Sequence, residues 1–145
     1  MKIKTHQLER ELFRPYGRIL LPDDEQTPEV SEPECFDFHV PFRESSQGWQ
    51  IGYLINRVDV IDQLECHPNT AEVFSPLKGR TVLVLTTDPE NMTEFRAFDL
   101  TEPIVLDRSV WHGVISLTDQ SDVLIVESPD VIDEFHRLPE SITVR

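Results

Sequence analysis

The sequence has little cysteine, no long apolar run and few positive charges. Only Cys35 and Cys66 occur among the 145 residues, and they form no CxxC pair, which excludes a disulfide framework. No apolar run approaches the ~18 residues that a membrane span requires, and the first residues are too polar for a secretory signal. We therefore expect a soluble, cytoplasmic protein that does not insert into a membrane.

Positive charge is scarce, because 13 lysines and arginines face 27 aspartates and glutamates, for a net charge of −14. Such a field repels the phosphate backbone, so a nucleic-acid partner is not expected. It also repels small anionic metabolites at long range. A site that binds such a metabolite must therefore supply its own local positive charge.

The N-terminal part of the chain predicts one short helix followed by a loop. The helix is expected from Thr5 to Phe13, with Thr5 as its cap and with Leu8 and Leu12 on one face. Residues 20–34 are acidic and rich in proline, which favours a loop, and its most acidic part is residues 22–34.

The rest of the chain has mostly β-type patterns. The strand candidates are the segments "GWQIGYLINRV", "RTVLVLTT", "TEFRAFDL" and "DVLIVES", separated by turn-forming residues. The apolar run from Arg80 is typical of a strand buried on both faces, and it is expected to form a hairpin with the strand after it. A further helical turn is expected around 131–135. The length fits a single domain over residues 1–145, and the pattern predicts an all-β sandwich or small barrel.

Four polar side chains could converge on a metal ion. Glu65 and His67 lie two residues apart, so on a strand they share a face, whereas Cys66 points away and is expected in the core. After the turn at "HPNT", Glu72 returns to the same side, and His112 is a fourth candidate. Carboxylates and imidazoles suit a divalent first-row metal. The alternative is an ordinary polar hairpin with solvated carboxylates.

The spacing of these residues resembles the two motifs of the cupin superfamily. Glu65 stands where the first histidine is usual, Glu72 and Gly79 follow at the spacing of the first motif, and "VWHGVISL" resembles the second motif. This resemblance implies a double-stranded β-helix, which is a jelly-roll barrel. Together with the local pattern, it predicts an all-β fold with a short N-terminal helix.

A narrower resemblance is to the ureidoglycolate lyase family. It rests on the segments "FRPYGRIL", "YLINRVDV", "ECHPNTAEVFSPLKG" and "DRSVWHGV". The resemblance implies metal-assisted cleavage of ureidoglycolate to glyoxylate and urea, a step of purine metabolism in allantoin catabolism. It also implies a homodimer and a small anionic metabolite as substrate.

Roles follow for individual residues on this hypothesis. Lys78 and Glu72 are the catalytic candidates, and Arg57 and Lys78 are candidates for binding the substrate carboxylate. The alternatives are that Lys78 is a solvated turn residue and that Arg57 forms a structural salt bridge. Trp111 is expected to pack against the barrel wall. The expected metal ligands are Glu65, His67, Glu72 and His112. A mixed nitrogen and oxygen site leaves nickel, manganese, iron and zinc open.

The sequence departs from the family pattern at two positions of the motifs. Glu72 stands where glutamine is common in the family, and Gly113 stands where a second histidine is common. Two other hypotheses remain. One is a non-catalytic small-molecule-binding cupin, in which loop 22–34 binds a partner. The other is a cupin enzyme that acts on another small hydroxy acid, such as a sugar-acid isomerase or a dioxygenase.

Overall fold

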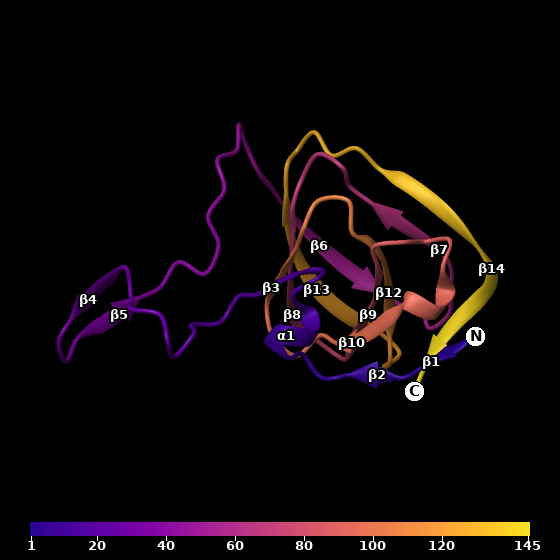
Figure 1. The fold of residues 1–145 in the computed structure, drawn as a ribbon, viewed down its shortest axis with the longest axis horizontal. Helices are drawn as coiled ribbons and strands as arrows, with labels where there is room; N and C mark the ends of the chain where they lie inside the picture. Colours follow the sequence, from indigo (N-terminus) through magenta and orange to yellow (C-terminus); the bar gives the residue numbers. More distant parts are fainter.

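The computed structural model describes residues 1–145, and nearly all of its regular structure is β (Figure 1). Two sheets face each other and enclose a core. The larger sheet has seven strands in the order β1 (Lys2–Ile3), β14 (Glu134–Val144), β7 (Ile61–Cys66), β12 (Trp111–Ser116), β9 (Thr81–Thr86), β10 (Arg96–Asp99) and β2 (Thr5–His6). The smaller sheet has five, in the order β3 (Gly17–Ile19), β11 (Ile104–Leu106), β8 (Glu72–Lys78), β13 (Ser121–Glu127) and β6 (Gln50–Asn56).

The two sheets form the expected jelly-roll barrel. Strands adjacent in space are mostly antiparallel and distant in sequence, as in the pairings of β12 with β7 and of β13 with β8. Both chain termini lie on the same side, because β1 runs parallel to β14 (Figure 1). The prediction of an all-β cupin-type barrel with a short N-terminal helix is confirmed.

The core lies between the sheets, and a second apolar cluster covers the other face of the larger sheet. Phe74, Val123 and Ile104 of the smaller sheet pack against Leu83 and Leu85 of β9. The alternate residues of β9 enter the second cluster, which also contains residues of β7, β10, β12 and β14. The prediction that this strand is buried on both faces is therefore confirmed, and so is its hairpin with β10.

The predicted N-terminal helix is present but shorter than expected. Helix α1 covers only Arg10–Phe13, and Glu9 at its N-terminus makes no side-chain capping bond. Thr5 is instead in β2, where it lies opposite Ala97, and its N–H donates to the carbonyl of Arg145. Pairing with the sheet edge thus overrides the local helical pattern. No helix in the structure is long and apolar enough to cross a membrane.

The predicted helical turn near the C-terminus is wrong. Residues 131–133 form no helix, and β14 starts at Glu134 and pairs with β7, so that Phe135 lies opposite Glu65. A short apolar pattern of this kind fits the period of a helix as well as that of a strand. Pairing with β7 decides in favour of the strand. One other short helical element occurs, the 3₁₀ turn η1 (Met92–Glu94) in the connection between β9 and β10.

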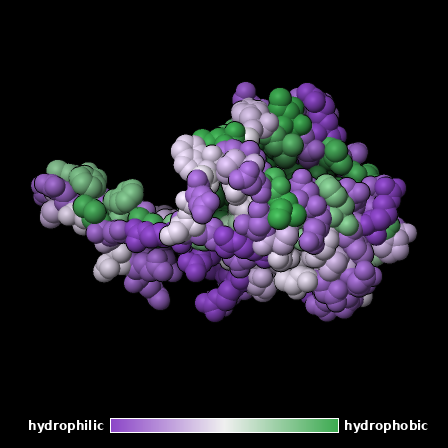
Figure 2. All heavy atoms as spheres, turned by 90° about the horizontal axis from the view of Figure 1, so that it is seen from above, coloured by the Kyte–Doolittle hydropathy of each residue, from purple (hydrophilic) through white to green (hydrophobic).

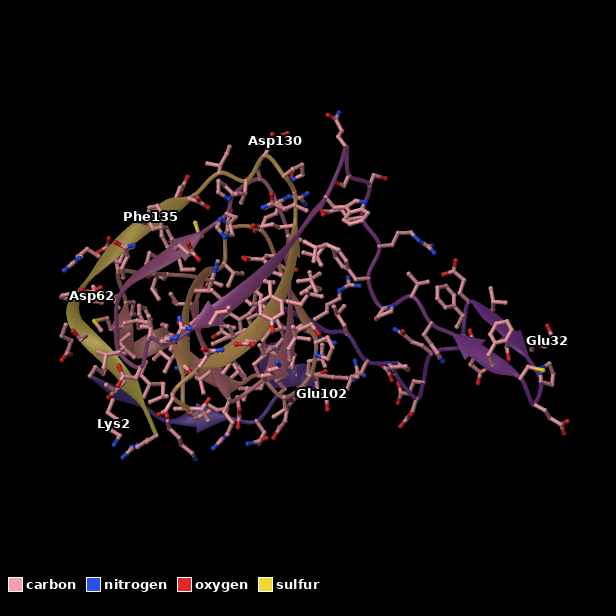
Figure 3. The ribbon with its side chains drawn as sticks, turned by 180° about the vertical axis from the view of Figure 1, so that it is seen from behind. Lys2, Glu32, Asp62, Glu102, Asp130 and Phe135 are labelled. Carbon is pink, nitrogen blue, oxygen red and sulfur yellow. The ribbon has the colours of Figure 1, made fainter.

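The acidic segment forms more than a loop. Within residues 22–48, which we call the arm, β4 (Val30–Glu32) and β5 (Phe36–Phe38) pair as a two-stranded hairpin. The arm projects away from the barrel, and Glu32 lies at its far end (Figure 3). At its root, Arg10 donates hydrogen bonds to the carbonyl oxygens of Leu21 and Pro22.

Candidate metal centre

The strand register brings the two motifs together inside the barrel. His112 on β12 lies directly opposite Glu65 on β7, and its Nε2 atom is 3.4 Å from Glu65 Oε1. His67 follows the last residue of β7, and its carbonyl oxygen accepts a hydrogen bond from the N–H of Ser109. Ser109 has a φ of 65°, which turns the chain into β12 just ahead of His112.

Glu72, the first residue of β8, reaches the same point from the facing sheet. Its Oε2 atom is 3.2 Å from His67 Nε2 and 3.3 Å from His112 Nε2. Both histidines and Glu72 are buried. The structure therefore brings together the four residues that the sequence selects as metal ligands.

The hydrogen bonds at Nδ1 leave Nε2 of each histidine free to bind a metal. His112 Nδ1 is 3.1 Å from the carbonyl oxygen of Val110, and His67 Nδ1 is 3.2 Å from that of Ile132. A carbonyl only accepts, so each Nδ1 carries the proton and donates it, and a neutral ring then has its lone pair at Nε2. Such a backbone contact fixes the orientation of a ligating imidazole.

Among the four candidate ligands, two buried atoms have no hydrogen-bond partner: His112 Nε2 and Glu72 Oε2. Unpaired buried polar atoms are rare, and each calls for a partner. A cation between the four side chains would satisfy both atoms, so this donor set fits a divalent metal.

The charges of the cluster also favour a bound cation. Burial disfavours a charged His67, but the adjacent Glu72 and the carbonyl of Ile132 outweigh it and raise the pKa of His67 to about 9. Burial also opposes protonation of His112, yet Glu65 and Glu72 raise its pKa. Contact with His112 lowers the pKa of Glu65. The carboxylates thus attract positive charge, whether from protons or from a metal ion.

Glu127, the last residue of β13, is a member of the cluster that the sequence reasoning missed. One of its oxygens lies within 4.8 Å of ligand atoms of both His67 and Glu72, and its Oε2 is buried without a partner. Burial and the charge of Glu72 raise its pKa. It ends an ordinary apolar strand, and only the pairing of β13 with β8 places it beside Glu72.

The structure does not bring Lys78 or Arg57 to the cluster, which corrects their expected placement. Lys78 ends β8 roughly 20 Å from Glu72, at about 3.3 Å per residue. A register shift in β13 puts it opposite Asp122. Arg57 donates a hydrogen bond to Gln120 beside the same aspartate. Both cations therefore lie at the far end of the smaller sheet.

Cys66 and Trp111 take the expected structural positions. Cys66 is buried, and burial raises the pKa of its thiol to about 11, which makes it a poor nucleophile. Trp111 packs against the second apolar cluster and lies 5.9 Å from the ring of His136.

A pocket of about 410 Å³ adjoins the cluster at Glu127. Thr70, Ala71 and Ser128 line it beside Glu127. The remainder of its wall is largely apolar and comes from the root of the arm and the outside of the smaller sheet, including Val40, Phe42, Trp49, Val73 and Val126. Of the candidate cluster, Glu127 is the residue that lines this pocket.

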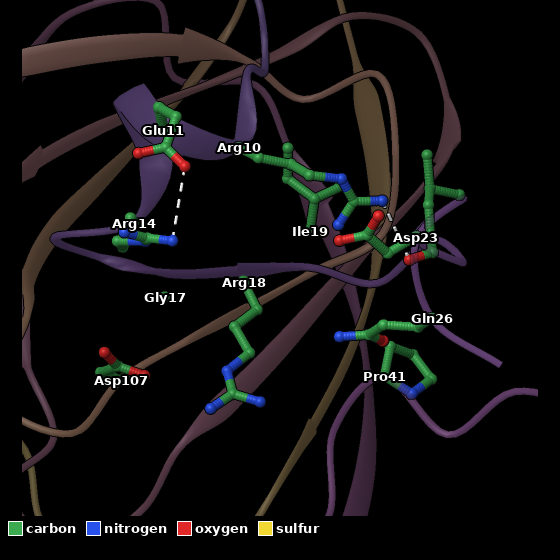
Figure 4. A pocket seen from close by; sticks show the side chains of 11 residues that line it. Arg10, Glu11, Arg14, Gly17, Arg18, Ile19, Asp23, Gln26, Pro41 and Asp107 are labelled. Atoms are coloured by element: carbon green, nitrogen blue, oxygen red, sulfur yellow. Dashed lines mark hydrogen bonds and ion pairs between the residues drawn. The ribbon is translucent and has the colours of Figure 1, made fainter. Parts of the chain in front are cut away.

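A second pocket, of about 520 Å³, lies beside α1 and contains no histidine (Figure 4). Three arginines line it, Arg10, Arg14 and Arg18, together with Glu11, Asp23 and Asp107. Arg14 lies 3.4 Å from Glu11, and Arg10 binds the carbonyls at the root of the arm. Positive and negative side chains are equal in number here, so the pocket has no excess of positive charge. Its role is structural, because Arg10 links α1 to the root of the arm.

Among solved structures, the chain resembles a mutant of Bacillus subtilis oxalate decarboxylase, at 14% identity and a TM-score of 0.42, over 76% of this chain. It spans about a third of that protein, 35%. It also resembles a dTDP sugar isomerase from Desulfovibrio desulfuricans G20, at 15% identity and a TM-score of 0.43, over 90% of this chain and 82% of that one.

Several curated proteins are similar to the chain in sequence. Ureidoglycolate lyase 2 of Rhizobium meliloti is 25% identical over 79% of this chain and 78% of its own length. Ureidoglycolate lyase 1 of the same species is 28% identical over 92% of this chain and 88% of its own. The enzyme of Brucella anthropi is 25% identical over 88% and 85%. The profile of the ureidoglycolate lyase family matches residues 1–144, and the chain therefore belongs to this family of lyases.

Proposed function

We propose that the protein cleaves ureidoglycolate to glyoxylate and urea with the help of one divalent metal ion. The observation that carries this proposal is the buried meeting of two imidazoles and a carboxylate from opposite sheets, with His112 Nε2 and Glu72 Oε2 left without partners. Membership of the family supports the same reaction, and with it a place in purine catabolism.

The metal would be held by Glu65, His67, Glu72 and His112. A bound divalent cation supplies positive charge for a carboxylate substrate and lowers the pKa of a substrate hydroxyl. Neither Lys78 nor Arg57 lies in the cluster to provide that charge. The manganese, iron, nickel and zinc ions all accept this mixture of nitrogen and oxygen ligands.

Glu127 is the carboxylate that remains after the four ligands are assigned, and it faces the adjoining pocket. We assign to it the proton transfer. Its carboxylate takes the proton of the substrate hydroxyl, the C–O bond becomes a carbonyl, and the C–N bond breaks. The same proton then returns to the departing nitrogen, which gives urea and leaves glyoxylate, so the reaction consumes no other reactant.

The test is glyoxylate release from ureidoglycolate by the metal-loaded protein, measured together with its metal content. We expect turnover with one metal per chain, and loss of both in His112→Ala. His136→Ala is the matched control, because His136 lies on β14 outside the cluster. A protein that binds metal but releases no glyoxylate would contradict the lyase proposal. That result would favour a binding cupin or an enzyme for another hydroxy acid.

A further inference from the structure

The hairpin at the end of the arm has one apolar face that nothing in its own chain covers. Val30 pairs with Phe38 and Glu32 with Phe36, so these four side chains share a face. Phe36 and Phe38 are 53% and 55% exposed. The opposite face is polar, with Ser31 donating a hydrogen bond to Asp37.

Such a hairpin needs a surface to pack against. The two-stranded sheet formed by β4 and β5 has no further strand, and an isolated hairpin is marginally stable in water. In the space-filling view, hydrophobic side chains stand out on the arm at its full distance from the barrel (Figure 2). The apolar face of the hairpin is therefore available for contact with another molecule.

A matching apolar surface occurs on the outside of the smaller sheet. Alternate residues of the edge strand β6 point outward, namely Ile51, Tyr53 and Ile55, and all three are exposed. Their neighbours across β13 and β8 continue the row, because Ile51 lies opposite Val126 and Val126 opposite Val73. We call this surface the outer face; Leu124, Leu77 and Trp49 extend it.

The outer face is unusual for so charged a chain. Charged residues are 28% of the sequence, yet the charged residues of β6, β8 and β13 on this face are confined to one end, where Asp122 lies opposite Lys78 and accepts a hydrogen bond from Tyr53. Two copies that each carry a charge of −14 repel one another, so a contact between them requires a neutral surface of this kind.

Charge at the ends of the two surfaces is complementary. The tip of the arm carries Glu32, Glu34 and Asp37. Lys78 and Arg57 lie beside Asp122 at one end of the outer face. After the hydrogen bonds from Tyr53 and Gln120, the charges of these two cations contribute to lowering the pKa of Asp122. An acidic hairpin would therefore meet positive charge there.

The exposed area is of the right size for a stable contact. Eight of the large apolar side chains that are exposed lie on the hairpin or the outer face: Val30, Phe36, Phe38, Trp49, Ile51, Tyr53, Ile55 and Leu77. Four are aromatic; complete burial of such a side chain covers about 150–250 Å², and these four are 53–69% exposed, so more than half of that area is available for a contact. A specific interface buries about 800 Å² on each partner, which this surface can provide.

We propose that two copies of the chain associate by exchanging arms. The apolar face of the hairpin of one copy packs on the outer face of the other, and its acidic tip meets Lys78 and Arg57. The contact is reciprocal, so a two-fold axis closes the dimer and both exposed surfaces are covered. This proposal does not depend on the lyase reaction.

Self-association of the full chain, measured by sedimentation equilibrium over a range of concentrations, tests the proposal. We expect a dimer that the double variant Phe36→Ser, Phe38→Ser weakens by more than about tenfold. Phe135→Ser is the matched control, because Phe135 is equally exposed but lies on β14, on the side away from the arm (Figure 3). Circular dichroism of each variant separates weakened association from unfolding.

Charge reversal tests the second part of the contact. Lys78→Glu should weaken the dimer, whereas Lys2→Glu, the same change on β1 in the other sheet, should leave it unchanged. If both variants weaken the dimer equally, the effect is one of net charge and the proposed contact at Lys78 is wrong.

Cys35 gives a direct readout of where the arm lies. It is exposed in the turn between β4 and β5, and it can carry a photoreactive cross-linker, whereas Cys66 is buried and its pKa is raised to about 11. In a mixture of unlabelled and ¹⁵N-labelled protein, we expect cross-links between light and heavy chains that map to residues 51–57 or 77–80. A monomer at every concentration, a dimer insensitive to the hairpin variants, or cross-links within one chain would each overturn the proposal.

Discussion

His112 and Glu65 face each other across a single pair of strands, with His112 Nε2 3.4 Å from Glu65 Oε1. They lie far apart in the sequence, and each belongs to a different motif. The register of β12 against β7 therefore decides whether the two motifs form one site. A slip of one residue would turn one of these side chains to the other face of the sheet.

Glu65→Gln tests the contribution of this pair to metal binding. The substitution keeps the size of the side chain but removes its charge, so we expect metal affinity to fall by at least about tenfold. Competition with a metal-sensitive dye measures the affinity. Asp62→Asn on the same strand is the control, because Asp62 is exposed and pairs with Arg137 on the surface. Equal affinities of the two variants would remove Glu65 from the ligand set.

Glu72→Gln separates metal binding from substrate binding. It replaces a buried carboxylate with an amide of the same size, so the cluster loses one negative charge. We expect weaker metal binding, by about tenfold, because the ligand charge falls. With saturating metal, we expect a lower KM for an anionic substrate, because less negative charge opposes it. A KM that rises at saturating metal would contradict this reading of Glu72.

Asn69 is expected to act by holding His67 in place. Its Nδ2 donates to the carbonyl of Asp130, and its Oδ1 accepts from the N–H of Ile132, whose own carbonyl lies 3.2 Å from His67 Nδ1. Asn69→Ala should free this segment and lower metal affinity by roughly 10- to 100-fold. Asn91→Ala, which removes a comparable side-chain bond at η1, is the control. Unchanged affinity in Asn69→Ala would show that Ile132 holds its position without Asn69.

Much of the site could be predicted from the sequence because its geometry is local. Glu65 and His67 are two residues apart, so the period of a strand is enough to place both on one side. Glu72 follows after one turn but comes close from the facing sheet, because β8 belongs to the smaller sheet and does not pair with β7. His112 required a resemblance, since only the fold brings it close. Glu127 has no local pattern at all: it depends on the pairing of β13 with β8.

The predictions for Lys78 and Thr5 are wrong because long-range strand pairing, which has no local pattern, decides where both residues lie. Lys78 follows the first motif closely in sequence, but a strand carries it away from Glu72. Thr5 has a helix-capping side chain, yet the sheet edge at Ala97 provides backbone partners that a short helix does not. Local patterns therefore give the strands and the ligands near a turn, whereas long-range pairing decides the rest.

The metal-free protein should lose stability as the pH rises. The pKa of His67 is raised in the folded state from 6.5 to about 9, so folding strengthens its hold on the proton. The stabilisation that the folded state gains from protonated His67 is fully present below pH 6.5 and is lost as the pH rises through 9. We expect the Tm of chelator-treated protein to fall over that window, and His67→Gln to reduce the fall. His39→Gln in the arm is the control, and an equal fall in the His67 variant would contradict the assignment.

The glycine after His112 is required by packing on the outside of the larger sheet. A Cβ atom at Gly113 would lie 2.5 Å from Ile61 Cδ1 and 3.1 Å from Leu64 Cδ2. Gly113→His should therefore lower the free energy of unfolding by roughly 1–3 kcal/mol. Denaturant titration measures this. Gly52→Ala is the control, because its Cβ would meet Ile125 at an ordinary 3.7 Å. Adding Ile61→Ala should restore part of the loss in Gly113→His by making room. If the double variant is no more stable than expected from adding the two separate losses, Ile61 is not what excludes a side chain at this position.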